Sequence, residues 1–102
     1  MSIWELNGRL PPKTDNQKIA VEIKSFLSAS DINDLEEAVG QYNLYRDILS
    51  EIEPDRTLYL AVPERAYKGI LSEPLGKLIL TRQQLQIIVF RESEERIIQW
   101  IP

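Results

Sequence analysis

Two strand-like segments flank a long helical segment, and this order limits the folds open to the chain. Residues 18–25 read KIAVEIKS, with apolar side chains at every second position. Residues 31–52 follow with an apolar stripe at helical spacing, made of Ile32, Leu35, Val39, Tyr42, Leu49 and Ile52. Residues 57–62 read TLYLAV, a second strand. A strand, a crossover helix and a strand place the two strands parallel in one sheet. We therefore expect an α/β fold in which the first strand is central.

The expected helix carries its own start and stop signals. Ser30 is a natural N-cap, and Asp31 and Asp34 suit the positive end of the helix dipole. Pro54 ends the helix, because the residue before a proline disfavours helical geometry. Gly40 lies in the middle, where it costs about 1 kcal/mol relative to alanine. One reason for a glycine here would be a close contact between the helix and the sheet beneath it.

The second half of the chain adds short helices and two more strands. Residues 63–71 are expected to be helical, with another short helix near residues 75–80. Strands are expected at residues 85–91 and 96–101, and the four polar residues between them predict a hairpin. The whole is expected to be a mixed sheet with helices packed on it.

The length of 102 residues suits one domain. Residues 1–17, with their paired prolines, are expected to form an N-terminal arm, and residues 18–102 a single domain. No apolar run approaches the roughly 18 residues of a membrane-spanning helix. The first residues lack the features of a signal peptide, so a cytoplasmic location is expected.

Two absent residue types exclude much chemistry. The chain has no cysteine and no histidine, which removes thiol nucleophiles, imidazole bases and most zinc sites. A metal cofactor would have to be an oxygen-liking ion such as Mg²⁺ or Mn²⁺. The net charge is −4 and the basic residues are scattered, which disfavours tight DNA binding by the chain alone. Composition favours a protein partner or a small ligand in a cleft.

Glu22 and Lys24 interrupt an apolar strand and form the candidate catalytic pair. One residue separates them, so both lie on the same strand face. On a buried strand these charges need a partner, a metal or a cleft. In a cleft, the carboxylate of Glu22 would ligate Mg²⁺ or Mn²⁺ and Lys24 would orient water for phosphodiester cleavage. The alternative is a strand with one solvated face, and spacing alone favours that alternative.

Gln41 and Tyr45 form a candidate binding pair on the helix that follows this strand. They are four residues apart and therefore neighbours on one helix face. Their amide and phenol groups could reach the edge of the same cleft and hydrogen-bond a phosphate. The alternative is that Tyr45 lies at the edge of the core and Gln41 at the surface.

Three segments, in order along residues 18–102, carry a family resemblance. They read IAVEIKSFLSASDINDLEEAVGQYNLYRDIL, LYLAVPERAYKGI and VFRESEERIIQWIP. They resemble the XisH family, the fdxN element excision controlling factors. The resemblance implies a restriction-endonuclease-like fold, similar to the PD-(D/E)XK nucleases. Glu22 and Lys24 then fall on the E-x-K element, and Gln41 and Tyr45 on a Q-x-x-x-Y element. It also implies a role in programmed excision of a DNA element beside an XisI-like partner protein.

The N-terminal part of the chain departs from the nuclease pattern. That pattern places a metal-binding aspartate on a strand well upstream of the E-x-K element, but only 21 residues precede Glu22. Neither Asp15 nor Glu5 matches the motif. One carboxylate holds magnesium poorly without further oxygen ligands. The shortened front would also leave one side of the sheet uncovered, so a homo- or hetero-oligomer is expected.

Two functions remain open from these observations. The first is a non-catalytic or degenerate nuclease-like subunit, an accessory factor that reaches DNA through a complex with its XisI-like partner. The second is a metal-dependent DNA endonuclease that cleaves phosphodiesters through Glu22 and Lys24. The family resemblance motivates both, and the incomplete metal site favours the first.

Overall fold

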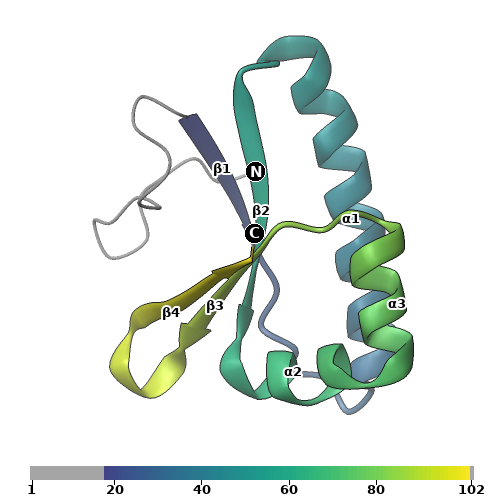
Figure 1. Cartoon of the computed structure of the whole chain (residues 1–102), viewed down its shortest axis with the longest axis vertical. Helices are drawn as coiled ribbons and strands as arrows, with labels where there is room; N and C mark the ends of the chain where they lie inside the picture. The colour runs from purple at the N-terminus through teal and green to yellow at the C-terminus, as the bar shows by residue number, and fades with distance from the viewer. Residues whose placement is uncertain (1–17, 102) are drawn as a thin grey trace.

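The computed structural model describes residues 18–101, so the expected N-terminal arm of residues 1–17 lies outside the described residues. Figure 1 shows the elements in chain order. They are β1 (Lys18–Ile23), α1 (Asp31–Ile52), β2 (Arg56–Pro63), α2 (Glu64–Lys68), a 3₁₀ turn (Ile70–Ser72), α3 (Pro74–Arg82), β3 (Ile87–Arg91), a second 3₁₀ turn (Glu92–Glu94) and β4 (Arg96–Ile101). Within these residues, no helix is long and apolar enough to cross a membrane.

The four strands form one mixed sheet in the order β1-β2-β3-β4. β1 runs parallel to β2, and β2 runs parallel to β3. β3 and β4 are antiparallel and form the expected C-terminal hairpin. The crossover from β1 through α1 to β2 is also present. The predicted α/β class is therefore confirmed.

The position of β1 corrects one expectation. Within the described residues, β1 lies at an edge of the sheet and pairs with β2 alone. A crossover helix requires two parallel strands in one sheet, but it does not require a further strand on the outer side of the first. The buried centre is β2 instead, where the run from Leu58 to Pro63 is buried throughout. Glu22 therefore lies on an edge strand, and Lys24 directly follows that strand, where solvent can reach one side.

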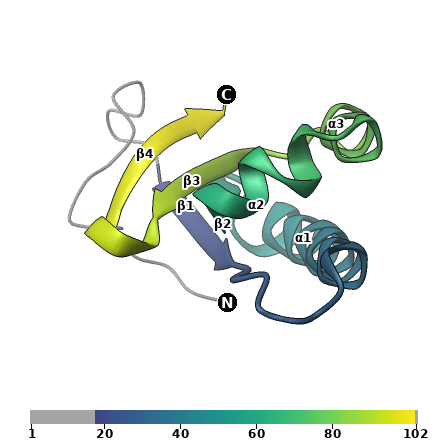
Figure 2. The same ribbon diagram turned by 90° about the horizontal axis from the view of Figure 1, so that it is seen from below.

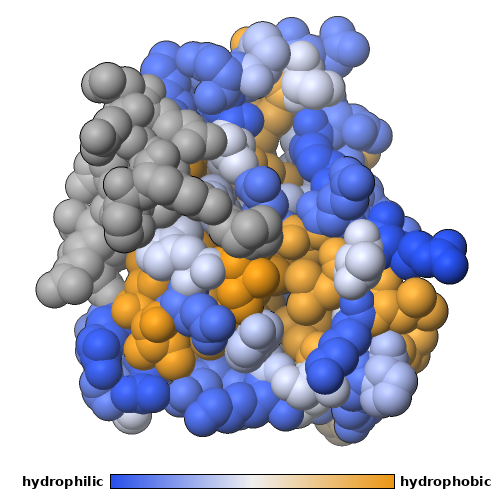
Figure 3. Space-filling model, viewed as in Figure 1, coloured by the Kyte–Doolittle hydropathy of each residue, from blue (hydrophilic) through white to orange (hydrophobic). Residues whose placement is uncertain are grey.

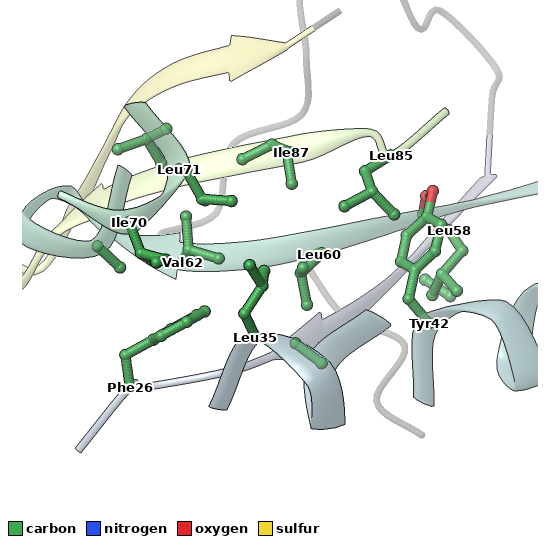
Figure 4. Close-up of a cluster of buried hydrophobic side chains, with 14 of the residues drawn as sticks. Phe26, Leu35, Tyr42, Leu58, Leu60, Val62, Ile70, Leu71, Leu85 and Ile87 are labelled. Carbon is green, nitrogen blue, oxygen red and sulfur yellow. The ribbon is translucent and has the colours of Figure 1, made fainter. Parts of the chain in front are cut away.

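The main core lies between the sheet and the helices. All three α-helices of residues 18–101 pack on the same side of the sheet, as Figure 2 shows. Figure 4 shows the side chains that meet there from α1, β2, β3 and the first 3₁₀ turn. Burying each large aliphatic side chain contributes about 1.5–3 kcal/mol to stability. This cluster includes Leu35, Leu60, Leu71 and Ile87, each at most 1% exposed.

A second, smaller cluster lies on the opposite face of the sheet and is built from strand residues alone. Ile19 and Val21 belong to this face, whereas Ala20 belongs to the main core. The expected alternation in β1 is therefore confirmed, and it places Glu22 on the face that carries the helices. Trp100 packs edge-on against Tyr59 in this second cluster, with ring centroids 5.2 Å apart.

α1 begins and ends where its sequence signals predict. The side chain of Ser30 accepts a hydrogen bond from the backbone N–H of Asn33 at 3.2 Å, and Glu53 caps the other end. The close contact considered for Gly40 is not found among the described residues, because a Cβ atom there would meet nothing within 4 Å. Nothing in the described structure requires glycine at this position. Ile52 was also expected in the buried stripe, but it is 66% exposed.

The elements after β2 differ in detail from the prediction. The single helix expected over residues 63–71 is split, because α2 ends at Lys68 and a 3₁₀ turn follows Gly69. β3 begins at Ile87 rather than at residue 85. The cause is Gln84, whose backbone is left-handed with φ 52°, so that the chain is still turning there.

Candidate functional site

Lys24 is the best-defined member of the predicted site, and it contacts α1. Its Nζ lies 3.2 Å from Oε1 of Glu37 and 3.9 Å from Oδ1 of Asp34. Its backbone N–H donates to the carbonyl of Ala61 at 3.0 Å, which fixes the residue at the carboxyl end of β1. The ammonium group therefore links the end of an edge strand to the first turns of the crossover helix.

Asp34 is the one buried charged residue in the described part of the chain, at 4% exposure. Its Oδ2 accepts a hydrogen bond from the backbone N–H of Ser28 at 3.1 Å. A buried carboxylate needs a positive partner and hydrogen-bond donors, and here Lys24 and Ser28 supply them. The sequence predicts for Asp34 only a place at the helix start, where its charge suits the helix dipole. The structure gives it a further role in holding the loop before α1.

The loop between β1 and α1 is fixed from a second direction by Arg65 of α2. The guanidinium of Arg65 donates to the carbonyls of Ser25 at 2.6 Å and Phe26 at 2.7 Å. Phe26 is buried although its backbone is left-handed, with φ 55°. This strained position is held by core packing and by Arg65, so the loop that follows Lys24 is an ordered part of the fold.

Glu22 is half-buried and faces the side of the sheet that carries α1. It lies opposite Leu60 in the register with β2. Within residues 18–101 its carboxylate makes no ion pair or hydrogen bond, and no ion pair joins it to Lys24. The structure thus places the two predicted residues on one face but gives Lys24 different partners.

Gln41 and Tyr45 lie one and two turns beyond Glu37 on α1. Tyr45 is half-buried and packs at the margin of the main core, whereas Gln41 is exposed. Neither side chain makes a hydrogen bond within the described part of the chain. Helical spacing puts both on the flank of α1 that carries Asp34 and Glu37. A shared role of this pair with Glu22 stays a prediction.

The described acidic residues do not provide enough neighbouring ligands for a metal site. Among residues 18–101, no group of three or more acidic side chains lies close enough to hold an ion. Glu22 contributes one carboxylate, and Asp34 and Glu37 already contact Lys24. Mg²⁺ and Mn²⁺ prefer several oxygen ligands, so a cation at Glu22 would need oxygen atoms from elsewhere.

The family follows from a match of the amino-acid sequence to a known protein family. Residues 9–98 match the family described as XisH protein. The chain belongs to the XisH family. No match was found among curated proteins.

Two solved structures resemble this XisH family member along 84% of its length. A crystal structure of an XisH family protein from Nostoc punctiforme PCC 73102 is 39% identical, with a TM-score of 0.82 and 68% of its chain covered. A crystal structure of an fdxN element excision controlling factor protein from Anabaena variabilis is 45% identical, with a TM-score of 0.81 and 67% of its chain covered. About a third of each relative therefore lies outside the similarity.

Sequence reasoning missed a polar centre around Tyr42, which it had assigned to the apolar stripe. The Tyr42 hydroxyl donates to the carbonyl of Leu58 at 2.9 Å and accepts from the N–H of Gln86 at 3.2 Å. Burial raises the pKa of this phenol. Arg46 lies 5.0 Å from the centre of its ring. No local signal marks this centre, because it joins a helix, a strand and a turn that are distant in sequence.

Proposed function

We propose that this XisH family member is an excision controlling factor that acts without catalysing phosphodiester cleavage itself. The family membership and the name of the Anabaena variabilis relative support the role in excision. The observation that carries the non-catalytic part is the ion pairing of Lys24 with Glu37 and Asp34. A lysine engaged by two carboxylates is poorly placed to orient a water molecule on a metal ion.

The exposed face of α1 supports a role in binding a protein partner. Leu44, Ile48 and Ile52 follow one another at intervals of four residues and are 57%, 41% and 66% exposed. This spacing aligns them on one helix face. The other exposed charges of α1 are acidic, because its single basic residue, Arg46, turns toward the residues after α3. We propose that an XisI-like protein docks here with an apolar strip flanked by basic side chains.

The distribution of positive charge supports contact with DNA through such a complex. Ten lysines and arginines lie within residues 18–101, and seven of them form ion pairs with carboxylates. A cation that is already paired gains less from a phosphate. The partner would then supply most of the contacts to the DNA backbone.

An excision assay separates the two candidate functions. Cells that lack the native gene would receive the chain, its XisI-like partner and a reporter element whose excision is measured. Glu22→Gln keeps the size of the side chain and removes its charge. We expect this variant to excise normally, whereas Ile48→Glu should abolish both complex formation and excision. Lys68→Gln, on the exposed surface of α2, is the matched control.

A metal-dependent endonuclease is the second candidate, and one observation favours it. The half-buried carboxylate of Glu22 has no partner within residues 18–101, so no described residue competes with a cation for it. Loss of excision in Glu22→Gln, with the complex intact, would establish this function and refute ours. Cleavage of DNA by the purified complex with Mn²⁺, absent in Glu22→Gln, would lead to the same conclusion.

A further inference from the structure

A basic pocket lies at the other end of β2 from the Lys24 ion pairs. It has a volume of about 870 Å³ and opens between α1, α3 and the first residues of β2. Its walls include the apolar side chains of Leu58, Leu80, Leu85 and Ile101. In Figure 3, hydrophobic surface is exposed in the middle of the face between the strands and α3. The volume is within the range of small-molecule sites, roughly 300–1,000 Å³.

The pocket exists because β2 and β3 do not pair directly at the start of β2. The N–H of Leu60 donates to the carbonyl of Gln86 at 2.8 Å. In a regular parallel ladder, the neighbouring hydrogen bond would run from the N–H of Gln86 to the carbonyl of Leu58. The Tyr42 hydroxyl lies between these two groups instead: it accepts a hydrogen bond from the N–H of Gln86 and donates one to the carbonyl of Leu58. β2 and β3 are therefore held apart at this point, and the first residues of β2 line the pocket.

Uncompensated positive charge gathers at this pocket. Arg46, Lys77 and Arg82 are the three described cations that form no ion pair with another residue of 18–101, and Arg46 and Lys77 line the pocket. Arg46 donates only to neutral oxygens, of Asn43 and of the Gln83 and Gln84 carbonyls. The third basic lining residue, Arg56, is neutralised by Glu53. No acidic residue lines the pocket, although the chain as a whole is acidic.

One buried hydrogen-bond acceptor of a residue that lines the pocket lacks a donor. Oε1 of Gln86 is buried and has no partner within the described structure. A buried carbonyl without a donor costs about 1–3 kcal/mol, so such groups are rare in folded proteins. Gln86 is also a lining residue. Because this atom is enclosed, a ligand could contact it only if the Gln86 side chain moved.

From these features we propose that the pocket binds a nucleoside-sized phosphate monoester, such as a mononucleotide. A phosphate monoester carries a charge of about −1.5 to −2 near neutral pH, which matches the two unpaired cations. Its base would lie against the apolar walls. This site is separate from Glu22, Lys24, Gln41 and Tyr45, and the proposal does not depend on the function proposed above.

The direct test is a titration of the ¹⁵N-labelled full chain with AMP, followed by amide chemical shifts. We expect saturable shifts at the backbone amides of Leu58, Gln84 and Gln86. The same titration with GMP, CMP and UMP shows which base is bound most tightly. Adenosine lacks the phosphate and inorganic phosphate lacks the apolar part, so both should bind at least about tenfold more weakly, the effect of about 1.4 kcal/mol. Added salt should weaken the binding of AMP.

Three variants assign the roles of individual side chains. Lys77→Gln removes an exposed cation and should weaken AMP binding about tenfold, as expected for loss of one charge-assisted hydrogen bond. Gln86→Met removes the unpaired acceptor at similar volume and should leave the free chain at least as stable. Lys68→Gln removes an exposed cation that is paired with Glu64 on α2, and it should bind AMP like the native chain.

Several results would overturn the proposal. One is the absence of saturable shifts with all four nucleotides at millimolar concentration. Another is AMP affinity that is unchanged in Lys77→Gln, or lowered equally in Lys68→Gln. Shifts centred on the start of α1, near Ser30 and Asn33, would place the anion at the helix terminus instead. Equal affinity for inorganic phosphate and AMP would show that the apolar walls take no part.

Discussion

Replacing Tyr42 by phenylalanine removes one oxygen atom that holds three elements together. The hydroxyl connects α1 to β2 through Leu58 and to the residue before β3 through Gln86. Tyr42 is 1% exposed, and its ring is part of the main core, as Figure 4 shows. Phenylalanine would fill the same space. The change therefore isolates the hydrogen bonds from the packing.

The expected loss follows from the groups left behind. The carbonyl of Leu58 would lose a partner at a buried position, and the N–H of Gln86 would lose one at a part-buried position. A buried group without a partner costs about 1–3 kcal/mol, so we expect the free energy of unfolding to fall by about 2–3 kcal/mol for the pair. In a domain of this size that corresponds to a melting temperature lower by roughly 10–20 °C.

The measurement is urea and thermal unfolding of the native and variant chains, followed by circular dichroism. Tyr45→Phe is the matched control, because Tyr45 lies on the same helix and its hydroxyl has no hydrogen-bond partner in the described structure. We expect the control to change stability by less than about 0.5 kcal/mol. Equal effects of the two substitutions would refute the bridging role of the Tyr42 hydroxyl. A loss in Tyr42→Phe below about 1 kcal/mol would mean that Gln86 and Leu58 pair directly and that the basic pocket closes.

Three further predictions concern single positions. Gly40→Ala should raise the free energy of unfolding by about 0.5–1 kcal/mol in urea titrations, because its Cβ would meet nothing within 4 Å. Gly76→Ala should prevent stable folding or shift the unfolding midpoint sharply downward, because its Cβ would lie 2.0 Å from the carbonyl oxygen of Ile70. Glu64 has its pKa lowered from 4.5 to about 2, chiefly by hydrogen bonds from Arg91. The resulting stabilisation is present above the ordinary pKa and lost as the pH falls toward 2, so melting curves of the native chain and Glu64→Gln should converge in acid.

The elements of this fold could be predicted where the signal is local. The apolar alternation in β1, the Ser30 cap and the polar residues before β4 each act within a few residues, and each element formed as expected. The edge position of β1 could not be predicted in this way. Strand order depends on which segments pair across the sheet, and the crossover fixes only the relation between β1 and β2.

The candidate site was predicted less completely than the fold. Glu22 and Lys24 share a strand face as their spacing requires, but the partners of Lys24 come from α1. Those partners were visible in the sequence as acidic residues of the first helical turns. Their contact with Lys24 depends on how α1 lies across the end of β1, which no spacing rule supplies. The basic pocket was missed for the same reason, because its lining comes from four separate segments.

The structural role of Lys24 changes how its substitution must be interpreted. A buried carboxylate at Asp34 loses its nearest positive charge in Lys24→Ala, and breaking a buried pair in this way costs about 3–5 kcal/mol when the pair is fully enclosed. The Lys24 side chain is 20% exposed, so the cost should be smaller but still measurable. A loss of excision in Lys24→Ala could therefore come from unfolding of the loop that leads into α1. Glu22→Gln has no such effect, because Glu22 supports no other described residue. The charge on Glu22, and not the one on Lys24, is therefore the decisive test of catalysis.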